Sequence, residues 1–178
     1  MIEVKIASYK EAKIVSDVAV KTFRESFGYL FDDAEIESFL RKTFACEKIE
    51  SDLRENNNIF SLAYFNGAPV GYYKLKLFSG AVDQFDPDAV QIHKIYLLKE
   101  FQGRHIGGHL LRHLLSLPQL FNFNYLWLLV LDTNLRAISF YQKYGFVKTA
   151  KRPFQIMGQE YQYDLMIRNR KYIDENQH

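Results

Sequence analysis

The stretch Phe101-Gln102-Gly103-Arg104-His105-Ile106-Gly107-Gly108 is the part of the chain that decides the fold. It follows an apolar-rich run over 90–97 and precedes leucines at helical spacing over 107–117, which predicts a strand, a tight turn and a helix. The first N–H groups of a helix have no partner within the helix, and glycine lets a ligand approach the main chain. The turn is therefore predicted to bind an anion, with a diphosphate as the best fit. A plain strand-to-helix turn is the alternative interpretation.

The residues after this turn complete a crossover. The helix is expected to end before Pro118, and the nearly all-apolar run over 125–131 is typical of a buried central strand. Two strands joined through a helix are expected to lie side by side in parallel, with the helix on one face. A helix over 134–144 that ends at Gly145 follows, and strands over 146–150 and 161–168 close the chain.

The residues before the turn predict helices and then a hairpin. A strand over 3–7 precedes Ser8-x-x-Glu11, which has the spacing of a capping box. Three helices are expected: one after this box, one after the acidic start at 32–35, and one over 47–55. Strands over 59–65 and 70–78 flank Asn66-Gly67, the dipeptide best suited to a type I′ turn. In the second of these strands Tyr73, Leu75 and Leu77 alternate with Tyr72, Lys74 and Lys76.

The composition indicates one globular domain. The chain has 178 residues, of which 48% are apolar and 25% charged. A formal net charge of +2 gives no basic excess for nucleic-acid binding, and the single cysteine, Cys46, excludes a disulfide scaffold and fits a reducing compartment. No apolar run is long enough for a signal peptide or a membrane span. We expect a cytoplasmic protein without nucleic-acid or membrane partners.

Two motifs carry a resemblance to a known family. The segment Gln102-x-x-x-Ile106-Gly107 resembles the Q/R-x-x-G-x-G/A turn of the GNAT superfamily of acyl-CoA-dependent N-acetyltransferases, although His105 stands where glycine is usual. Residues 134–146 resemble the family's N-x-x-A-x-x-F-Y-x-x-x-G-F helix. The ending over 154–166 is similar to the PaiA-type branch, bacterial polyamine (spermidine/spermine) N-acetyltransferases.

The resemblance implies the fold and the activity. The fold would be α/β (α+β), with a mixed, mostly antiparallel twisted sheet of about seven strands, a central parallel β-α-β unit and flanking helices. A single domain would cover 1–170, followed by a polar tail over 171–178. The activity would be transfer of an acetyl group from acetyl-CoA to a primary amine of a small substrate, for which a polyamine is one candidate. If the His105 position needs a positive φ, a side chain there costs roughly 1–2 kcal/mol.

The same resemblance implies the residues that hold acetyl-CoA. The strand before the turn would offer main-chain groups to the pantetheine arm, and the turn would hold the diphosphate. Asn134 would fix backbone or pantetheine geometry at the next helix start, with a plain N-cap as the alternative. Lys143 would reach a phosphate, although a solvated lysine is the interpretation that its type favours. The expected cofactor residues are Ile95, Tyr96, Leu97, Gln102, Gly103, Arg104, His105, Ile106, Gly107, Gly108, Asn134 and Lys143.

Acetyl transfer needs an acid and a base. The resemblance implies that Tyr141 lies near the sulfur, and a phenol with a pKa of about 10 is protonated at neutral pH. His93, on the same strand face as Ile95 by period-2 spacing, is the candidate base. A core tyrosine and a hydrogen-bonded surface histidine are the alternatives. Similar polyamine enzymes carry acidic residues on this strand, whereas this chain has Gln91 and His93, which weakens the case for a polycationic substrate.

The acceptor pocket is expected to involve Phe23, Phe27, Tyr29 and Phe31 together with the 79–88 loop, although the rings fit core packing equally well. Asp83, Asp86 and Asp88 of this loop would attract a cationic amine, with a solvated loop as the alternative. His105, His109 and His113 have four-residue spacing, but no carboxylate or thiol completes a metal site, and we interpret them as a solvated helix face. A monomer or a homodimer is expected. The alternative functions are acetylation of a protein N-terminus or lysine, and a non-catalytic acyl-CoA-binding module.

Overall fold

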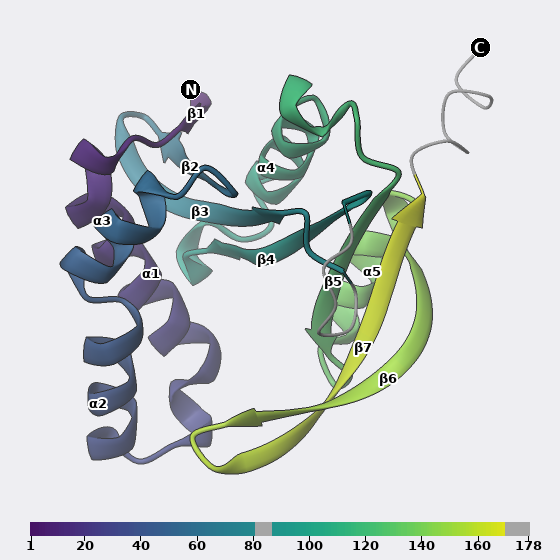
Figure 1. Cartoon of the computed structure of the whole chain (residues 1–178). Helices are drawn as coiled ribbons and strands as arrows, with labels where there is room; N and C mark the ends of the chain where they lie inside the picture. The colour runs from purple at the N-terminus through teal and green to yellow at the C-terminus, as the bar shows by residue number, and fades with distance from the viewer. Residues whose placement is uncertain (81–86, 170–178) are drawn as a thin grey trace. The chain divides into compact units, whose positions relative to one another are not determined.

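The computed structural model describes residues 1–80 and 87–169. Its described strands form one sheet in the order β1-β2-β3-β4-β5-β7-β6 (Figure 1). They are β1 (Ile2–Ile6), β2 (Asn58–Phe65), β3 (Ala68–Leu77), β4 (Ala89–Leu97), β5 (Tyr125–Leu131), β6 (Val147–Ile156) and β7 (Gln159–Asn169). The five described α-helices are α1 (Ala12–Phe27), α2 (Asp33–Thr43), α3 (Cys46–Arg54), α4 (Ile106–Leu115) and α5 (Leu135–Lys143).

The strand directions confirm the expected fold class. β1 with β2, β5 with β7, and β6 with β7 pair antiparallel, whereas β4 and β5 pair in parallel across the crossover that contains α4. The Asn66-Gly67 turn has φ of +50° and +83°, as a type I′ hairpin requires. The mixed sheet with one parallel pair and flanking helices is therefore present as predicted.

Capping residues set the expected helix starts. The carboxylate of Glu11 accepts from the backbone N–H of Ser8 at 2.7 Å, ahead of a single 3-10 turn (Tyr9–Glu11) and α1. Asp32 accepts from the backbone N–H of Glu35 at 2.8 Å and begins α2. Both helix starts confirm the sequence prediction.

The chain forms two compact units that are not continuous in sequence. Unit 1 comprises residues 1–75 and 94–118, and unit 2 comprises residues 76–93 and 119 onward. A single domain over 1–170 stays a prediction beside this division. The tail over 171–178 and the loop residues 81–86, including Asp83 and Asp86, lie outside the described residues.

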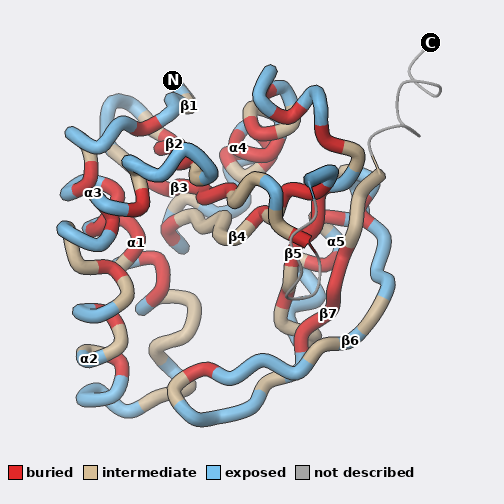
Figure 2. The backbone as a smooth tube through the Cα atoms, viewed as in Figure 1, coloured by how far each residue is buried: buried red, intermediate tan, exposed pale blue. Residues whose placement is uncertain are grey.

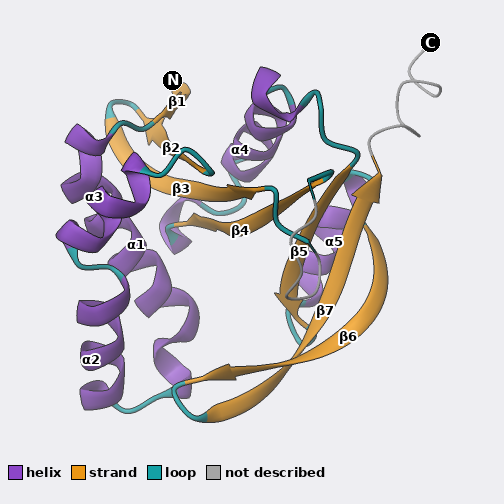
Figure 3. Ribbon diagram, in the orientation of Figure 1, coloured by secondary structure: helices purple, strands orange, loops and turns teal. Residues whose placement is uncertain are grey.

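In unit 1, helices cover both faces of β3. Tyr73 faces α4, where its hydroxyl lies 2.9 Å from Nδ1 of His113, whereas Lys74 faces α3 and contacts Asp52. Figure 3 shows α3 and α4 on opposite sides of β3. Both faces of β3 are consequently buried: Tyr72, Tyr73, Lys74 and Leu75 are all 5% exposed or less. The alternation seen in the sequence does not separate a core face from a solvent face here.

Unit 2 is built around β5 and the β6–β7 hairpin. Trp127 and Leu165 are buried against Ala89, and the indole N–H of Trp127 donates to the carbonyl of Ser79 at 2.6 Å. β6 extends to Ile156 and is largely exposed (Figure 2). The prediction of a strand that ends at residue 150 was wrong, because the chain continues through Pro153 to a turn at Met157 and Gly158, whose φ values are +48° and +78°.

Candidate functional site

The turn before α4 is exposed and contains two residues with positive φ. Gly103 and His105 have φ of +82° and +62°, and residues 102–105 are exposed. His105 is the N-cap of α4 but provides no side-chain cap, so the first N–H groups of α4 receive no side-chain acceptor from the N-cap residue. Ile106 is fully buried and anchors the start of the helix. An uncapped helix end is the feature on which the prediction of anion binding depends, and the binding itself stays a prediction.

The main chain just before the turn is anchored on two sides within unit 1. Leu98 donates its backbone N–H to the carbonyl of Val70 on β3 at 2.9 Å. The next residue, Lys99, donates its backbone N–H to the carboxylate of Glu25 on α1 at 2.8 Å. The side chain of Gln102 donates to the carbonyl of Leu97 at 3.3 Å. These bonds position the turn relative to β3 and α1.

Arg104 lies against two aromatic rings. Its guanidinium carbon is 5.8 Å from the ring centroid of Phe65 and 5.5 Å from that of Phe101. The two rings are themselves 5.7 Å apart. A guanidinium stacked on rings keeps its charge while its motion is restricted. The sequence showed the charge of Arg104 but not this arrangement of rings around it.

β4 is paired with β5 over only part of its length. The parallel register joins residues 89–91 to 125–127, whereas β4 continues to Leu97. The three strand residues expected to hold the pantetheine arm, Ile95, Tyr96 and Leu97, lie beyond this register and are half-buried. A strand edge of this kind offers main-chain N–H and C=O groups to an extended ligand.

The aromatic residues expected at the acceptor pocket differ in their exposure. Phe27 is half-buried, and its ring lies 6.1 Å from that of Tyr96 on β4. Tyr29 is 74% exposed, and Phe31 is half-buried after the short turn that follows α1. The ring of Tyr72, on β3, also lies 6.1 Å from that of Tyr96. Phe27, Tyr72 and Tyr96 therefore form an aromatic group on one face of β3 and β4 in unit 1.

The helix-face interpretation of the three histidines needs correction. His105 and His109 are exposed, but His113 is half-buried beside Tyr73. Burial raises the pKa of Tyr73 to about 12 and lowers the pKa of His113 below its usual value. His113 therefore belongs to the contact between α4 and β3 and not to a solvated face.

Unit 2 holds the second motif. Asn134 is the N-cap of α5, and its side-chain oxygen accepts from the backbone N–H of Ala137 at 3.1 Å. Tyr141 is 8% exposed, and its ring lies 5.4 Å from that of Phe140 and 5.8 Å from that of Phe146. Gly145 has φ of +81°, the left-handed conformation expected of a residue that ends a helix.

The other two predicted site residues of unit 2, His93 and Lys143, differ in exposure. His93 is half-buried near the end of the β4 segment that belongs to unit 2, whereas Lys143 is exposed in the last turn of α5. The exposure of Lys143 fits a solvated side chain as well as a phosphate contact. The roles of both residues stay predictions.

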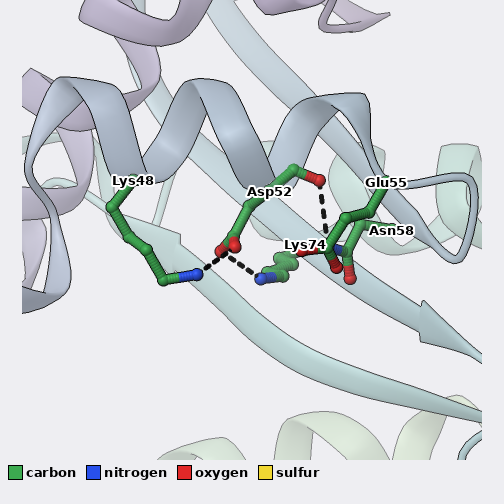
Figure 4. Close-up of polar contacts among 5 residues, drawn as sticks. All are labelled: Lys48, Asp52, Glu55, Asn58 and Lys74. Atoms are coloured by element: carbon green, nitrogen blue, oxygen red, sulfur yellow. Dashed lines mark hydrogen bonds and ion pairs between the residues drawn. The ribbon is translucent and has the colours of Figure 1, made fainter.

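The sequence did not predict a buried ion pair in unit 1 (Figure 4). Lys74 on β3 donates to Asp52 on α3 at 2.6 Å, with side chains that are only 6% and 11% exposed. Lys48, one turn earlier on α3, pairs with the other carboxylate oxygen of Asp52. Burial raises the pKa of Asp52, but the hydrogen bonds from the two lysines outweigh burial and hold the pKa below its ordinary value of 3.8.

Among the residues that the structure describes, no group of three or more His, Cys, Asp or Glu side chains is arranged to hold a metal ion. Within the same residues, no helix combines the length and the apolar character needed to cross a bilayer.

A family model described as "Acetyltransferase (GNAT) family" matches residues 20–146, which include both the turn before α4 and the whole of α5. The chain belongs to the GNAT acetyltransferase family. It is an acetyl-CoA-dependent acetyltransferase, as both motifs led us to expect.

Two proteins of similar sequence are named as N-acetyltransferases. An uncharacterized N-acetyltransferase of the pepI 3′ region from Lactobacillus delbrueckii subsp. lactis is 27% identical over 170 residues, which are 94% of this chain and 98% of that protein. A probable spermine N(1)-acetyltransferase from Bacillus subtilis subsp. natto is 27% identical over 84 residues, or 47% of this chain and 55% of that one.

Solved structures share the fold. The PaiA N-acetyltransferase from Thermoplasma acidophilum, in complex with coenzyme A, superposes with a TM-score of 0.76 at 20% identity over 95% of this chain and 99% of that one. The spermidine/spermine N-acetyltransferase SpeG from Vibrio cholerae gives a TM-score of 0.68 at 14% identity over 99% of both chains. The exposed turn over 102–105 and the uncapped start of α4 suit the diphosphate of acetyl-CoA.

Proposed function

We propose that the GNAT acetyltransferase described here transfers the acetyl group of acetyl-CoA to the primary amine of a small acceptor. The observation that carries the proposal is the turn before α4, in which two residues with positive φ lead into a helix without a side-chain cap. Acetyl-CoA supplies the acetyl group as a thioester. In the proposal, the amides of residues 102–108 hold its diphosphate, and the main chain of residues 95–97 holds its pantetheine arm.

Tyr141 is proposed as the general acid. Its position in the family motif supports this role, because a phenol with a pKa of about 10 is protonated at neutral pH and is only a slightly weaker acid than a thiol. Its burial beside Phe140 and Phe146 holds the ring in place. In the proposed step the acceptor nitrogen bonds to the acetyl carbon, the carbon–sulfur bond breaks, and Tyr141 donates its proton to the departing sulfur.

His93 is proposed as the base. An alkyl ammonium with a pKa of about 10.4 is only about 0.1% neutral at pH 7.4, so a group must take the proton of the acceptor. An imidazole does this near neutral pH, either directly or through a water molecule. The half-buried position of His93 on β4 supports the assignment.

A polyamine is the first acceptor to test, because the names of two similar proteins contain spermine or spermidine. A thiol-release assay with acetyl-CoA and a panel of primary amines tests the proposal. We expect one equivalent of free thiol for each acetylated amine. Coenzyme A binding without turnover on any amine would contradict the proposal and favour an acyl-CoA-binding module.

A further inference from the structure

We propose that Gly71 on β3 is a positioning residue for acetyl-CoA, because its missing side chain makes room for the main chain that holds the pantetheine arm. The inference rests on the proposed function, in which the main chain of residues 95–97 holds that arm. It names the residue of β3 that sets the place of this segment. Gly71 and residues 95–97 all belong to unit 1.

The main chain at the end of β4 lies very close to Gly71. A β-carbon at position 71 would lie 2.6 Å from the carbonyl oxygen of Tyr96, 3.0 Å from Cδ1 of Leu97 and 3.3 Å from Cα of Leu97. Real β-carbons are essentially never found within 3.0 Å of such a neighbour. The carbonyl oxygen belongs to the main chain, so it cannot turn aside as the end of a flexible side chain does. Only glycine therefore permits this approach.

The backbone conformation of Gly71 does not explain the glycine. Gly71 lies in the interior of β3 and is buried, and it is not one of the described glycines with positive φ. A glycine inside a strand weakens the strand because it has no side chain to pack, and it often marks the close approach of another backbone. The contact with Tyr96 therefore accounts for the glycine at this position.

The segment that lies against Gly71 is the one proposed to hold the pantetheine arm. Leu98 donates its backbone N–H to the carbonyl of Val70 at 2.9 Å, and Leu97 lies opposite Gly71, so the two strands run antiparallel here. Main-chain groups of successive residues in such a pair point alternately toward and away from the partner strand. The N–H of Leu97 therefore points away from β3, where an extended ligand can meet it.

A methyl group at position 71 would push the main chain of Tyr96 and Leu97 away from β3. Hydrogen bonds have a narrow range of lengths, so a displacement of a few tenths of an ångström weakens those to the pantetheine arm. The turn over 102–108 has an anchor of its own, the hydrogen bond from Lys99 to Glu25 on α1. Its hold on the diphosphate should change little. Gly71 should therefore affect one half of the ligand and not the other.

The test measures the two halves of the ligand separately in Gly71→Ala. Calorimetry gives the Kd of coenzyme A and that of 3′-phosphoadenosine 5′-diphosphate, which has the diphosphate but no pantetheine arm. We expect the Kd of coenzyme A to rise about tenfold and that of the nucleotide to stay within about twofold of the wild type. A variant that is only less stable would lose affinity for both ligands by the same factor, since only its folded fraction binds.

Gly28→Ala is the matched control, because it adds the same methyl group at the end of α1, where no close contact results. The added carbon would lie 3.6 Å from Cγ of Arg24 and 3.6 Å from Cδ1 of Ile36, which is ordinary packing distance. Both Kd values are expected to stay within about twofold of the wild type.

A second variant combines Gly71→Ala with Leu97→Ala. It removes the crowded side chain of Leu97 and leaves the carbonyl of Tyr96 in place, which separates side-chain packing from displacement of the main chain. We expect the loss of coenzyme A binding to remain about tenfold in this variant, with the nucleotide again within about twofold.

Four results would overturn the inference and leave acetyl transfer intact. They are an unchanged Kd of coenzyme A in Gly71→Ala, an equal loss for both ligands, recovery of coenzyme A binding in the double variant, and failure of both variants to fold. The last result would assign Gly71 to the fold alone. A wild type that binds coenzyme A no better than the nucleotide would contradict the proposed hold on the pantetheine arm itself, and the inference with it.

Discussion

Tyr141 has a ring that is largely buried in α5, and its hydroxyl is the only part of the side chain that phenylalanine lacks. Tyr141→Phe therefore removes the proposed proton donor and keeps the ring contacts with Phe140 and Phe146. We expect kcat to fall by at least about tenfold with little change in the Kd of coenzyme A. Thiol release and calorimetry measure the two quantities.

Tyr144 provides the control for that experiment, because it is a half-buried tyrosine at the C-cap of the same helix. Tyr144→Phe is expected to keep kcat within about twofold of the wild type. An unchanged kcat in Tyr141→Phe would remove Tyr141 from the mechanism.

His105 has a backbone conformation that suits glycine. Its φ of +62° lies in the left-handed region, which costs a residue with a side chain about 1–2 kcal/mol. Glycine removes this cost but gains freedom in the unfolded chain, worth about 0.5–1 kcal/mol. We expect His105→Gly to raise the free energy of unfolding by up to about 1 kcal/mol.

His105→Val tests the same backbone in the opposite direction. A β-branched residue is a strong outlier at positive φ, so we expect the free energy of unfolding to fall by about 1–2 kcal/mol. Urea denaturation of both variants measures the difference. Equal stability of the Val and Gly variants would show that the turn does not hold this conformation.

At the scale of elements, α1 positions the turn before α4 through one hydrogen bond. Glu25 accepts from the backbone N–H of Lys99, three residues before Gln102. Glu25→Ala removes this acceptor and loosens the turn. We expect the Kd of coenzyme A to rise about fivefold, which corresponds to about 1 kcal/mol. Calorimetric titration measures the change.

Lys21→Ala is the control at the same junction, because Lys21 forms an exposed ion pair with Glu100 at 3.3 Å. Exposed pairs of this kind contribute little, and we expect the Kd to stay within about twofold of the wild type. If both variants bind coenzyme A equally well, Glu25 has no part in holding the turn.

Most elements could be predicted because their sequences carry local signals. The helix starts at Ser8 and Asp32, the Asn66-Gly67 turn and the apolar strand β5 each depend on neighbouring residues. β6 could not be predicted in full, because it is an exposed edge strand without apolar alternation. Its turn places Met157 at positive φ, a position for which methionine gives no signal.

The candidate site was predictable where a short motif describes it. The turn over 102–108 and the N-cap Asn134 lie within the two motifs that carry the family resemblance. The Lys74–Asp52 and Tyr73–His113 contacts join residues 22 and 40 positions apart, so no local pattern indicates them. A lysine that alternates with leucine on a strand is usually a solvent-facing residue.

At the scale of the whole molecule, Asp52 links folding to pH. The pKa of Asp52 is lower in the folded protein than in the unfolded chain, so the folded protein binds fewer protons in this pH range. The resulting gain in the free energy of unfolding is fully present above about pH 4. That gain is lost as the pH falls through the lowered pKa. Asp52→Asn leaves Lys74 buried without a carboxylate, and we expect a loss of about 3 kcal/mol in the free energy of unfolding at pH 7.

The difference between Asp52→Asn and the wild type should shrink as the pH falls below about 4 and through the lowered pKa of Asp52 in the folded protein, because the carboxyl is then protonated in both states. Urea denaturation from neutral to acidic pH measures it. Lys48→Gln, which removes only the exposed partner, is expected to cost less than about 1 kcal/mol. A difference that does not change with pH would show that the charge of Asp52 does not stabilise the fold.

The central claim is that the main-chain amides of the turn over 102–108 bind the diphosphate of coenzyme A. Titration of the ¹⁵N-labelled chain with coenzyme A, and in parallel with pantetheine, tests it by NMR. We expect the largest amide shifts at Gly103, Gly107 and Gly108 with coenzyme A and much smaller shifts there with pantetheine. Equal shifts with both ligands, or shifts by coenzyme A that leave this turn unchanged, would contradict the claim.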